Sequence, residues 1–346
     1  MRICLLCGGQ SSEHEISLLS ARNVLSAMPR EYEVLVVGID KQGNWFWYPD
    51  GKYAEHLEGA SEIRLAETGR VSVFPVRKDA RAVLTPLEAG YAPQPFDLLF
   101  PMLHGKNGED GTVQALAQLL GCPCVGCHMT ASAVGMDKAF TKRIVEDEGV
   151  RTAHWVEIRR TDKSLPDVSH LGMPLFVKPA NAGSSVGVVK VTRPEELSAA
   201  VAEALKHDTK ALIEECITGR EIECAVLGNE EPFCPRPGEI VSAVDFYSYD
   251  AKYTMSDGAT VIAPADLPAE KAAVVQKIAC KVYRILGCRG MARVDFFLTP
   301  SGEWVFNEIN TIPGFTNISM YPKLMNAGGI SSQELLRKLV AFALED

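Results

Sequence analysis

The feature that most constrains the fold is the order of elements in the first 125 residues, where apolar strands alternate with helical stretches. Apolar runs stand at 2–9, 32–40 and 95–103, and a helical segment at 112–121 ends on glycine. Strands that are apolar on both faces and alternate with helices are typical of a parallel sheet covered by helices. The sequence therefore predicts an α/β fold whose N-terminal part is a Rossmann-like parallel-sheet domain, with hairpins or irregular excursions at 50–93.

The pattern changes near residue 126, where smaller α+β units begin. Residues 130–149 carry helical spacing throughout and predict one long helix. Short strands follow on either side of a loop rich in glycine and serine. We expect three domains at 1–125, 126–218 and 219–346, the last with a lid loop at 246–262 and a hairpin at 291–310.

Charge and hydropathy exclude several classes of protein. The formal net charge of −9 argues against a nucleic-acid-binding surface. No apolar run reaches the roughly 18 residues that a membrane span needs. The N-terminal run ends in Gly-Gly and reads as a strand, so no export signal is expected and the ten cysteines predict reduced thiols in the cytoplasm.

The cysteine-rich stretch at 122–128 raises the alternative of a metal site. It contains Cys122, Cys124, Cys127 and His128, but no second cluster with matching spacing stands elsewhere. Cys4 and Cys7 also form a CxxC pair, yet within a strand they point to opposite faces. Small buried residues are therefore the favoured interpretation of these cysteines.

The hairpin "MARVDFFLTPSGEWVFNEIN" places acidic residues at unusual positions. If Ser301 and Gly302 form a two-residue turn, Asp295 faces Glu308 and Arg293 faces Asn310, all on one face of the hairpin. Val294, Phe296, Phe306 and Ile309 are then the core positions. Such an oxygen-rich face suits magnesium, and Arg293 suits an oxygen that becomes negative during a reaction. A solvated hairpin face with mixed charges is the alternative.

Three further loops have the composition of ligand sites. The loop "KPANAGSSVGV" at 178–188 can bring main-chain N–H groups to an anion, with Lys138 and Lys178 as phosphate-binding charges, although such a loop alone is usually only a turn. The loop at 104–111 follows an apolar strand, where α/β ligand sites lie. A long polar and aromatic loop at 246–259 is typical of an active-site lid.

Together these motifs resemble the D-alanine–D-alanine ligases of the ATP-grasp superfamily, in particular the longer bacterial type. The resemblance covers the whole chain and includes "GGQSSEHEIS", "LHGKNGEDGTVQ", "MDK", "VKPANAGSSVGV", "YSYDAKY" and the segment "NEINTIPGFTNISMYPKL". It implies a three-domain ATP-grasp fold and the ATP-dependent joining of two D-alanines through an acyl phosphate, for peptidoglycan precursor synthesis. It also implies two Mg²⁺ ions, for which Mn²⁺ can substitute, and a cytoplasmic homodimer without nucleic-acid or membrane partners.

The resemblance also implies a role for individual residues. Those expected to bind ATP are Lys138, Lys178, Ser184, Ser185, Glu214, Glu215, Ile217, Glu221, Lys252, Phe297 and Asn307. Those expected to bind the two D-alanines are Glu13, His104, Arg293, Gly314, Ser319 and Met320, and the catalytic set is Glu13, Ser184, Tyr253, Arg293 and Gly314. The metal ligands would be Asp295, Glu308 and Asn310. Many relatives have Lys where this chain has Glu215, which puts a side-chain contact of Glu215 with adenine in doubt.

Two other functions remain open from the sequence. Another ATP-grasp ligase could use the same hairpin on a different carboxylate, and the segment "SSEHEIS", which grips an amino acid in the family, separates it from a D-alanine ligase. A non-catalytic nucleotide-binding or redox module could instead use the N-terminal sheet and the cysteines. The resemblance also bears on the acceptor: relatives that use D-lactate differ at this position, so Tyr253 implies an amine acceptor, with D-alanine before D-serine.

Overall fold

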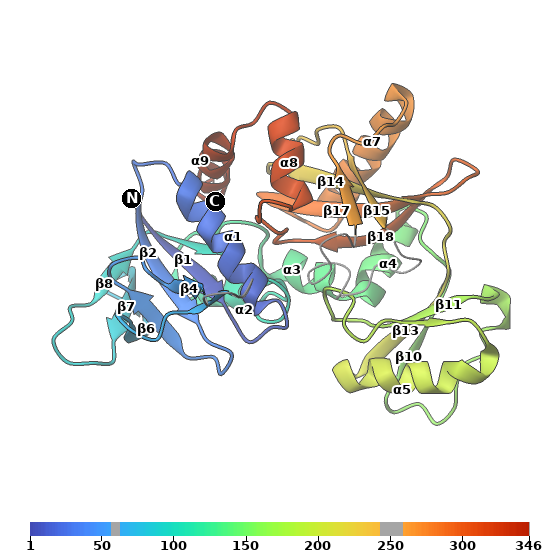
Figure 1. The fold of residues 1–346 in the computed structure, drawn as a ribbon, viewed down its shortest axis with the longest axis horizontal. Coiled ribbons are helices and arrows are strands. Elements are labelled where there is room, and N and C mark those ends of the chain that lie inside the picture. Colours follow the sequence, from blue (N-terminus) through green and yellow to red (C-terminus); the bar gives the residue numbers. More distant parts are fainter. Residues whose placement is uncertain (57–62, 243–258, 346) are drawn as a thin grey trace.

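The computed structural model describes residues 1–56, 63–242 and 259–345. Within them, the strands form a seven-stranded, a five-stranded and a four-stranded sheet, together with a two-stranded ribbon. Figure 1 shows the seven-stranded sheet at one end of the molecule, the four-stranded sheet at the other, and the five-stranded sheet above and between them. No helix in these described ranges is long and apolar enough to cross a bilayer.

The N-terminal sheet has the order β8-β7-β6-β3-β2-β1-β9. Its strands are β1 (Arg2–Gly8), β2 (Glu33–Ile39), β3 (Trp45–Tyr48), β6 (Val71–Lys78), β7 (Arg81–Pro86), β8 (Gln94–Phe96) and β9 (Leu98–Pro101). The predicted parallel sheet is confirmed for β2, β1 and β9. The ribbon is β4 (Ala54–His56) with β5 (Ile63–Leu65). Hairpins expected at 50–93 are also confirmed, as β4–β5 and β6–β7. The prediction did not foresee that β3, β6, β7 and β8 extend the same sheet as antiparallel strands.

Helices cover both faces of the parallel strands. Helix α1 (His14–Ala27) packs with Ile3, Leu5 and Cys7 of β1 on one face. Helix α2 (Thr112–Leu120) packs in the cluster that contains Cys4 and Leu6 on the other. The predicted opposite orientation of Cys4 and Cys7 is therefore confirmed, and all ten cysteines are free thiols.

The four-stranded sheet is antiparallel with the order β10-β13-β11-β12. Its strands are β10 (Trp155–Arg159), β11 (Leu175–Pro179), β12 (Val189–Val191) and β13 (Lys210–Glu215). Helix α5 (Leu197–His207) buries its apolar side against β11 and β13, and short 3-10 turns occupy Ser169–Leu171 (η1) and Pro194–Glu196 (η2). The loop 180–188, rich in glycine and serine, joins β11 to β12 at the edge of this sheet.

The five-stranded sheet is also antiparallel and has the order β16-β15-β14-β17-β18. Its strands are β14 (Arg220–Leu227), β15 (Gly238–Ser242), β16 (Ala259–Ile262), β17 (Met291–Leu298) and β18 (Trp304–Asn310). Helix α7 (Ala269–Ile285) packs against Val226 and Val294 on one face, while α8 (Met320–Ala327) packs against Ala225 and Leu227 on the other. The functional side chains described below lie on the α8 face.

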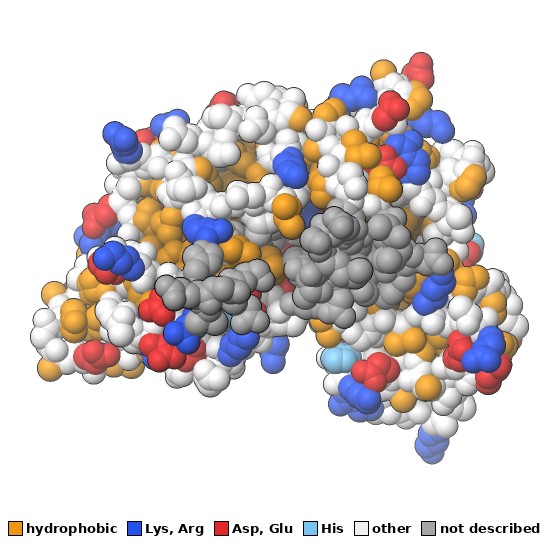
Figure 2. Space-filling model, in the orientation of Figure 1, with side chains coloured by type: hydrophobic (Ala, Val, Ile, Leu, Met, Phe, Trp, Pro, Cys, Tyr) orange, Lys and Arg blue, Asp and Glu red, His pale blue; other side chains and the backbone are white. Residues whose placement is uncertain are grey.

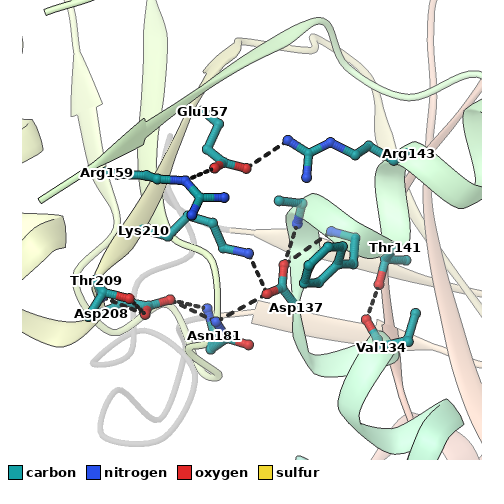
Figure 3. A network of polar contacts seen from close by, with 12 residues as sticks. Val134, Asp137, Thr141, Arg143, Glu157, Arg159, Asn181, Asp208, Thr209 and Lys210 are labelled. Carbon is teal, nitrogen blue, oxygen red and sulfur yellow. Dashed lines mark hydrogen bonds and ion pairs between the residues drawn. The ribbon is translucent and has the colours of Figure 1, made fainter. Parts of the chain in front are cut away.

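The segment expected as one helix at 130–149 is broken at Asp137. Helix α3 (Met129–Met136) ends there and α4 (Lys138–Asp147) begins, because the Asp137 carboxylate accepts the main-chain N–H groups of Ala139 and Phe140. Figure 3 shows that the Asp137 carboxylate also accepts hydrogen bonds from the Lys210 ammonium and the Asn181 amide. The capping residue therefore connects the start of α4 to the four-stranded sheet and its loop. An aspartate side chain that accepts nearby main-chain N–H groups favours the start of a helix over its interior. The prediction of one continuous helix was therefore wrong.

The C-terminal helix joins the two ends of the chain. Ser331 caps α9 (Ser332–Ala343) by accepting the N–H of Glu334. The helix then packs in one core with α1, and Arg337 Nε lies 2.6 Å from Glu31 Oε1. The division into domains at about residues 125 and 218 stays a prediction.

Candidate active site

The predicted pairing across the β17–β18 hairpin is confirmed at its functional end. Asp295 lies opposite Glu308, and Arg293 lies opposite Asn310. The expected two-residue turn is wrong, since the paired strands end at Leu298 and Trp304 and the register shifts between Asp295 and Phe296.

A β-bulge at Asn307 restores the predicted register. Phe296 pairs with Phe306, whereas Asp295 pairs with Glu308, so Asn307 is an extra residue in β18. An extra residue reverses the side-chain alternation. As a result Phe306 and Ile309 are both buried, as expected, and Asn307 faces the cavity.

Three carboxylates form a row across neighbouring strands on this face. Glu223 of β14 lies opposite Asp295, which lies opposite Glu308. Arg293 Nε lies 3.2 Å from Glu223 Oε2 and 2.8 Å from Asp295 Oδ1, and Lys138 Nζ lies 3.3 Å from Glu308 Oε2. Burial alone would lower the pKa of Arg293, but Asp295 and Glu223 outweigh it and raise that pKa well above its ordinary value. The arginine is therefore a fixed positive charge.

This face opens into a cavity of about 430 Å³. It is bounded by residues of α1, of the 104–109 and 182–184 loops, of the five-stranded sheet and of the segment that leads into α8. The predicted site residues among its lining are Glu13, His104, Lys138, Ser184, Glu221, Arg293, Asp295, Phe297, Asn307, Glu308, Asn310, Gly314, Ser319 and Met320. The structure thus brings most of the predicted site together from all parts of the chain.

Glu13 and Ser184 meet across the cavity, although 171 residues separate them in sequence. The Ser184 hydroxyl donates to Glu13 Oε1. Ser184 and Ser185 have positive φ angles of 49° and 60°, and a Cβ added at Gly183 would lie 2.8 Å from Glu13 Oε2. The loop therefore needs glycine at 183 to approach Glu13 this closely. Tyr253 and Lys252, which were also expected in the site, lie outside the described residues.

Lys178 and Glu214 lie outside this cavity, in a buried ion cluster with Lys142. Glu214 Oε2 lies 2.8 Å from Lys178 Nζ, and its Oε1 lies 3.1 Å from Lys142 Nζ. Burial lowers the pKa of Lys142. Burial alone would raise the pKa of Glu214, but the charges of Lys142 and Lys178 outweigh burial, so the pKa of Glu214 is lowered. Sequence reasoning missed Lys142, although its spacing of four from Lys138 on α4 places both on one helix face.

The remaining predicted nucleotide contacts on this side are not confirmed. Ser185, Glu215 and Ile217 are absent from the lining of the described cavity. The Glu215 carboxylate accepts the main-chain N–H of His154 at 2.8 Å. The side chain of Glu215 is therefore engaged by a neighbouring main-chain group of its own sheet.

His104 is buried and has partners at both ring nitrogens. Nδ1 lies 3.0 Å from the Ile312 carbonyl oxygen, and Nε2 lies 2.9 Å from Ser20 Oγ. Burial lowers the pKa of His104. Glu109, which sequence reasoning missed, is equally buried, and burial together with Glu13 raises its pKa to about 8. Glu109 lies five residues after His104 in the "HGKNGEDG" loop, which was already expected to form a ligand site, and this position could have indicated it.

Gly314 and Ser319 lie next to each other where the chain enters α8. A Cβ added at Gly314 would lie 2.8 Å from Ser319 Oγ. That oxygen accepts the main-chain N–H of Thr316 at 3.0 Å. Glycine at 314 therefore keeps the main chain accessible beside the serine hydroxyl.

The predicted metal ligands fit a hard cation by their chemistry. In the part of the chain that the structure describes, no three His, Cys, Asp or Glu side chains gather as a metal cluster. Asp295, Glu308 and Asn310 instead offer two carboxylates and one amide at one end of a hairpin. Magnesium is commonly bound by one or two carboxylates together with phosphate oxygens and water. The cysteine stretch at 122–128 lacks such a set, and Cys127 Sγ lies against main-chain carbonyls.

The fold and the site define the class of protein. A small antiparallel sheet with a glycine-serine loop lies beside a second antiparallel sheet that carries the acidic hairpin, and lysine and serine side chains reach the space between them. That combination is the ATP-grasp fold of carboxylate–amine ligases, here joined to an N-terminal α/β domain. On the face shown in Figure 2, acidic and basic side chains of the described residues are interspersed around this region.

Comparison with known proteins identifies the family. Residues 2–127 match the family described as D-ala D-ala ligase N-terminus, and residues 144–341 match D-ala D-ala ligase C-terminus. The chain is 47% identical over 350 residues to D-alanine–D-alanine ligase A of Chromobacterium violaceum, covering 100% of this chain and 95% of that protein. This chain belongs to the D-alanine–D-alanine ligase family.

Solved structures agree over the whole chain. The D-alanine–D-alanine ligase of Coxiella burnetii has a TM-score of 0.86 at 36% identity, covering 100% of this chain and 94% of that one. A D-Ala:D-Ser ligase from Enterococcus faecalis has a TM-score of 0.84 at 36% identity, covering 99% of each chain. The ligase of Bacillus anthracis complexed with ATP has a TM-score of 0.73 at 28% identity, covering 99% of this chain and 97% of that one.

Proposed function

We propose that this chain joins two D-alanines into D-alanyl-D-alanine, with ATP converted to ADP and phosphate, as a step in making peptidoglycan precursors. The observation that carries the proposal is the single cavity in which the Glu13–Ser184 pair, Arg293 and the acidic hairpin meet. An amine-binding carboxylate, an oxyanion-binding guanidinium and a phosphate-transfer centre are the groups that such a ligation needs. Family membership over the full chain supports the same reaction.

The first step activates a carboxylate, which is a poor electrophile on its own. Glu13 holds the ammonium group of the first D-alanine, and that substrate's carboxylate attacks the γ-phosphate of ATP. The products of this step are an acyl phosphate and ADP. Lys138 lines the same cavity and neutralises charge on the transferred phosphate. Asp295, Glu308 and Asn310 would hold magnesium, which when bound supplies further neutralisation of phosphate oxygens.

The second step forms the peptide bond. The unprotonated amine of the second D-alanine attacks the acyl phosphate carbon, and phosphate leaves after a tetrahedral oxyanion has formed. Arg293 and the main-chain N–H of Gly314 stabilise that oxyanion. Ser319 binds the carboxylate of the second D-alanine, and Met320 lines the same end of the cavity. Exclusion of water protects the acyl phosphate from hydrolysis, and the segment 246–262 is proposed as the lid.

The assembly and location follow the family. We infer a homodimer in the cytoplasm, with two Mg²⁺ per active site and with Mn²⁺ able to replace them. In the proposed three-domain arrangement, residues 1–125 bind the first substrate and ATP binds between 126–218 and 219–346.

The test is a substrate panel. ADP and phosphate release is measured with ATP and magnesium in the presence of D-alanine, D-serine, D-lactate, L-alanine or no amino acid, and the products are identified by mass spectrometry. D-alanine-dependent ADP release with one dipeptide per ADP supports the proposal. Turnover that is independent of D-alanine overturns it, and a mixed D-Ala-D-Ser product from D-alanine and D-serine would assign the acceptor specificity of the Enterococcus faecalis relative instead.

A further inference from the structure

The segment 312–315, which carries Gly314, is held by hydrogen bonds from the N-terminal domain. The Ile312 N–H donates to Glu109 Oε1 at 3.1 Å, and the Ile312 carbonyl lies 3.0 Å from His104 Nδ1. The Phe315 N–H donates to Ser20 Oγ at 3.1 Å. The main chain on both sides of Gly314 is therefore fixed by side chains that are more than 200 residues away in sequence.

Ser20 is the residue that links the two sides. His104 Nδ1 faces a carbonyl, which can only accept, so Nδ1 carries the ring proton and Nε2 of the neutral ring is an acceptor. The Ser20 hydroxyl then donates to Nε2 at 2.9 Å, while its oxygen accepts the N–H of Phe315. One hydroxyl thus orients the histidine that holds Ile312 and also binds Phe315 directly.

Ser20 cannot touch a substrate in this structure. It is 0% exposed and is absent from the lining of the active-site cavity, which His104 and Gly314 both line. Any effect of Ser20 on the reaction must therefore pass through the 312–315 segment or through His104.

We propose that Ser20 is a positioning residue for peptide-bond formation, because it aligns the Gly314 amide with the oxyanion of the second step. The inference rests on the proposed function, in which that amide stabilises the oxyanion. A misplacement of about 1 Å in a catalytic group can cost roughly 100-fold in rate. Losing a hydrogen-bond donor to an oxyanion costs about 100- to 1,000-fold.

The chain offers a matched control on the same helix. Ser17 is also 0% exposed, and its hydroxyl donates to the Met102 carbonyl and accepts the N–H of Gly8 at 2.7 Å. Both serines therefore bind one main-chain donor, and both are buried in α1. The Ser17 partners belong to the N-terminal sheet region and not to the 312–315 segment.

The experiment compares Ser20→Ala with Ser17→Ala in the full-length protein. The values of kcat, KM for ATP and thermal stability are measured with D-alanine as substrate. Both variants are expected to lose stability. Ser20→Ala should lower kcat by about 10- to 100-fold with KM for ATP changed less than twofold, whereas Ser17→Ala should keep kcat within twofold of the parent.

The comparison is repeated with Ser20→Cys and Ser17→Cys, which keep the shape of the side chain but replace the hydroxyl by a weak hydrogen-bonding group. These variants decide the question if Ser20→Ala does not fold. The proposal is overturned if the kcat of the Ser20 variants lies within twofold of that of the Ser17 variants, or if KM for ATP rises by the same factor as kcat falls. A parent enzyme without D-alanine-dependent ADP release would instead refute the proposed function, so the two failures are distinct.

Discussion

Arg293 and Asp295 form a two-pronged ion pair along one strand, with Nε 2.8 Å from Oδ1 and Nη2 2.7 Å from Oδ2. They are two residues apart in β17, so both side chains leave the same face of the sheet. Asp295 also accepts the Asn310 amide at 3.1 Å, and Glu223 lies on the other side of Arg293. The proposed oxyanion-binding group and the proposed metal ligand are therefore one electrostatic unit, in which Glu223 gives Arg293 a second carboxylate.

Arg293→Lys is expected to lower kcat by about 100- to 1,000-fold, the loss typical of removing an oxyanion donor. Lysine keeps the charge but lacks the planar fork that binds Asp295 at two points. Steady-state kinetics measure the change. Arg220→Lys is the control, because Arg220 makes a comparable two-pronged pair with Glu239 on the same sheet but outside the cavity. Equal kcat values for the two variants would contradict the role of Arg293.

Glu308→Gln is expected to abolish dipeptide formation. The substitution removes a proposed metal ligand and also the carboxylate that lies 3.3 Å from Lys138 Nζ. Product formation is followed by mass spectrometry. Glu303→Gln, in the exposed turn of the same hairpin, should keep activity within about twofold, since surface substitutions have small effects. Cys124→Ser should also keep activity, because Cys124 does not line the cavity. Full dipeptide-forming activity of Glu308→Gln would contradict its role as a metal ligand. A parent protein that forms no dipeptide and co-purifies with NAD or a metal would favour the non-catalytic module.

The active face of the hairpin was predicted correctly because the extra residue at Asn307 offsets the one-residue error in the expected turn, so that Arg293, Asp295, Glu308 and Asn310 still share one face. The turn was not. The Phe306 N–H donates to the Arg151 carbonyl, so a distant segment takes a hydrogen bond from β18 next to the bulge at Asn307. The tertiary structure determines this hydrogen-bond partner, so the residues of the turn alone could not predict it.

The burial of charged side chains was the other feature that the sequence did not predict. Lys142 and Glu109 lie in segments whose polarity is ordinary, and their burial follows from neighbours that are far away in sequence. The break at Asp137 differs from these, because an aspartate before a helical run is a local capping signal. That signal was present in "MDKAF" and was outweighed by the continuous helical pattern around it.

Glu214→Gln is expected to lower the free energy of unfolding by about 3–5 kcal/mol, the usual loss when one partner of a buried ion cluster is removed. The side chains of Lys142, Lys178 and Glu214 are only 1%, 10% and 6% exposed, so water cannot replace the lost carboxylate. Urea unfolding gives the value. Glu203→Gln, which removes an exposed pair with Lys206 on α5, should change the free energy of unfolding far less, because exposed ion pairs contribute little. Similar losses in the two variants would show that the buried cluster contributes no more than a surface pair.

Glu109 makes the stability of the protein depend on pH in a direction that can be worked out. Its pKa is raised from 4.5 to about 8 in the folded protein, chiefly by burial and then by Glu13. Between these values the unfolded chain is ionised at this position while the folded protein keeps the proton. The folded state then binds more protons, so the contribution of Glu109 to stability falls as pH rises, by at most about 1.4 kcal/mol per pH unit.

Glu109→Gln removes this titrating group, so the difference between the parent and the variant reports the contribution of Glu109 alone. The free energy of unfolding of the parent minus that of Glu109→Gln should decrease steadily from about pH 5 to pH 8 and level off on either side. His104 acts in the opposite direction, because its lowered pKa makes stability rise with pH below about 6.5. It is present in both proteins, so its contribution largely cancels in the difference. Urea unfolding at pH 5.5, 6.5, 7.5 and 8.5 measures the curve, and a difference that stays flat or increases with pH would mean that Glu109 is ionised in the folded protein.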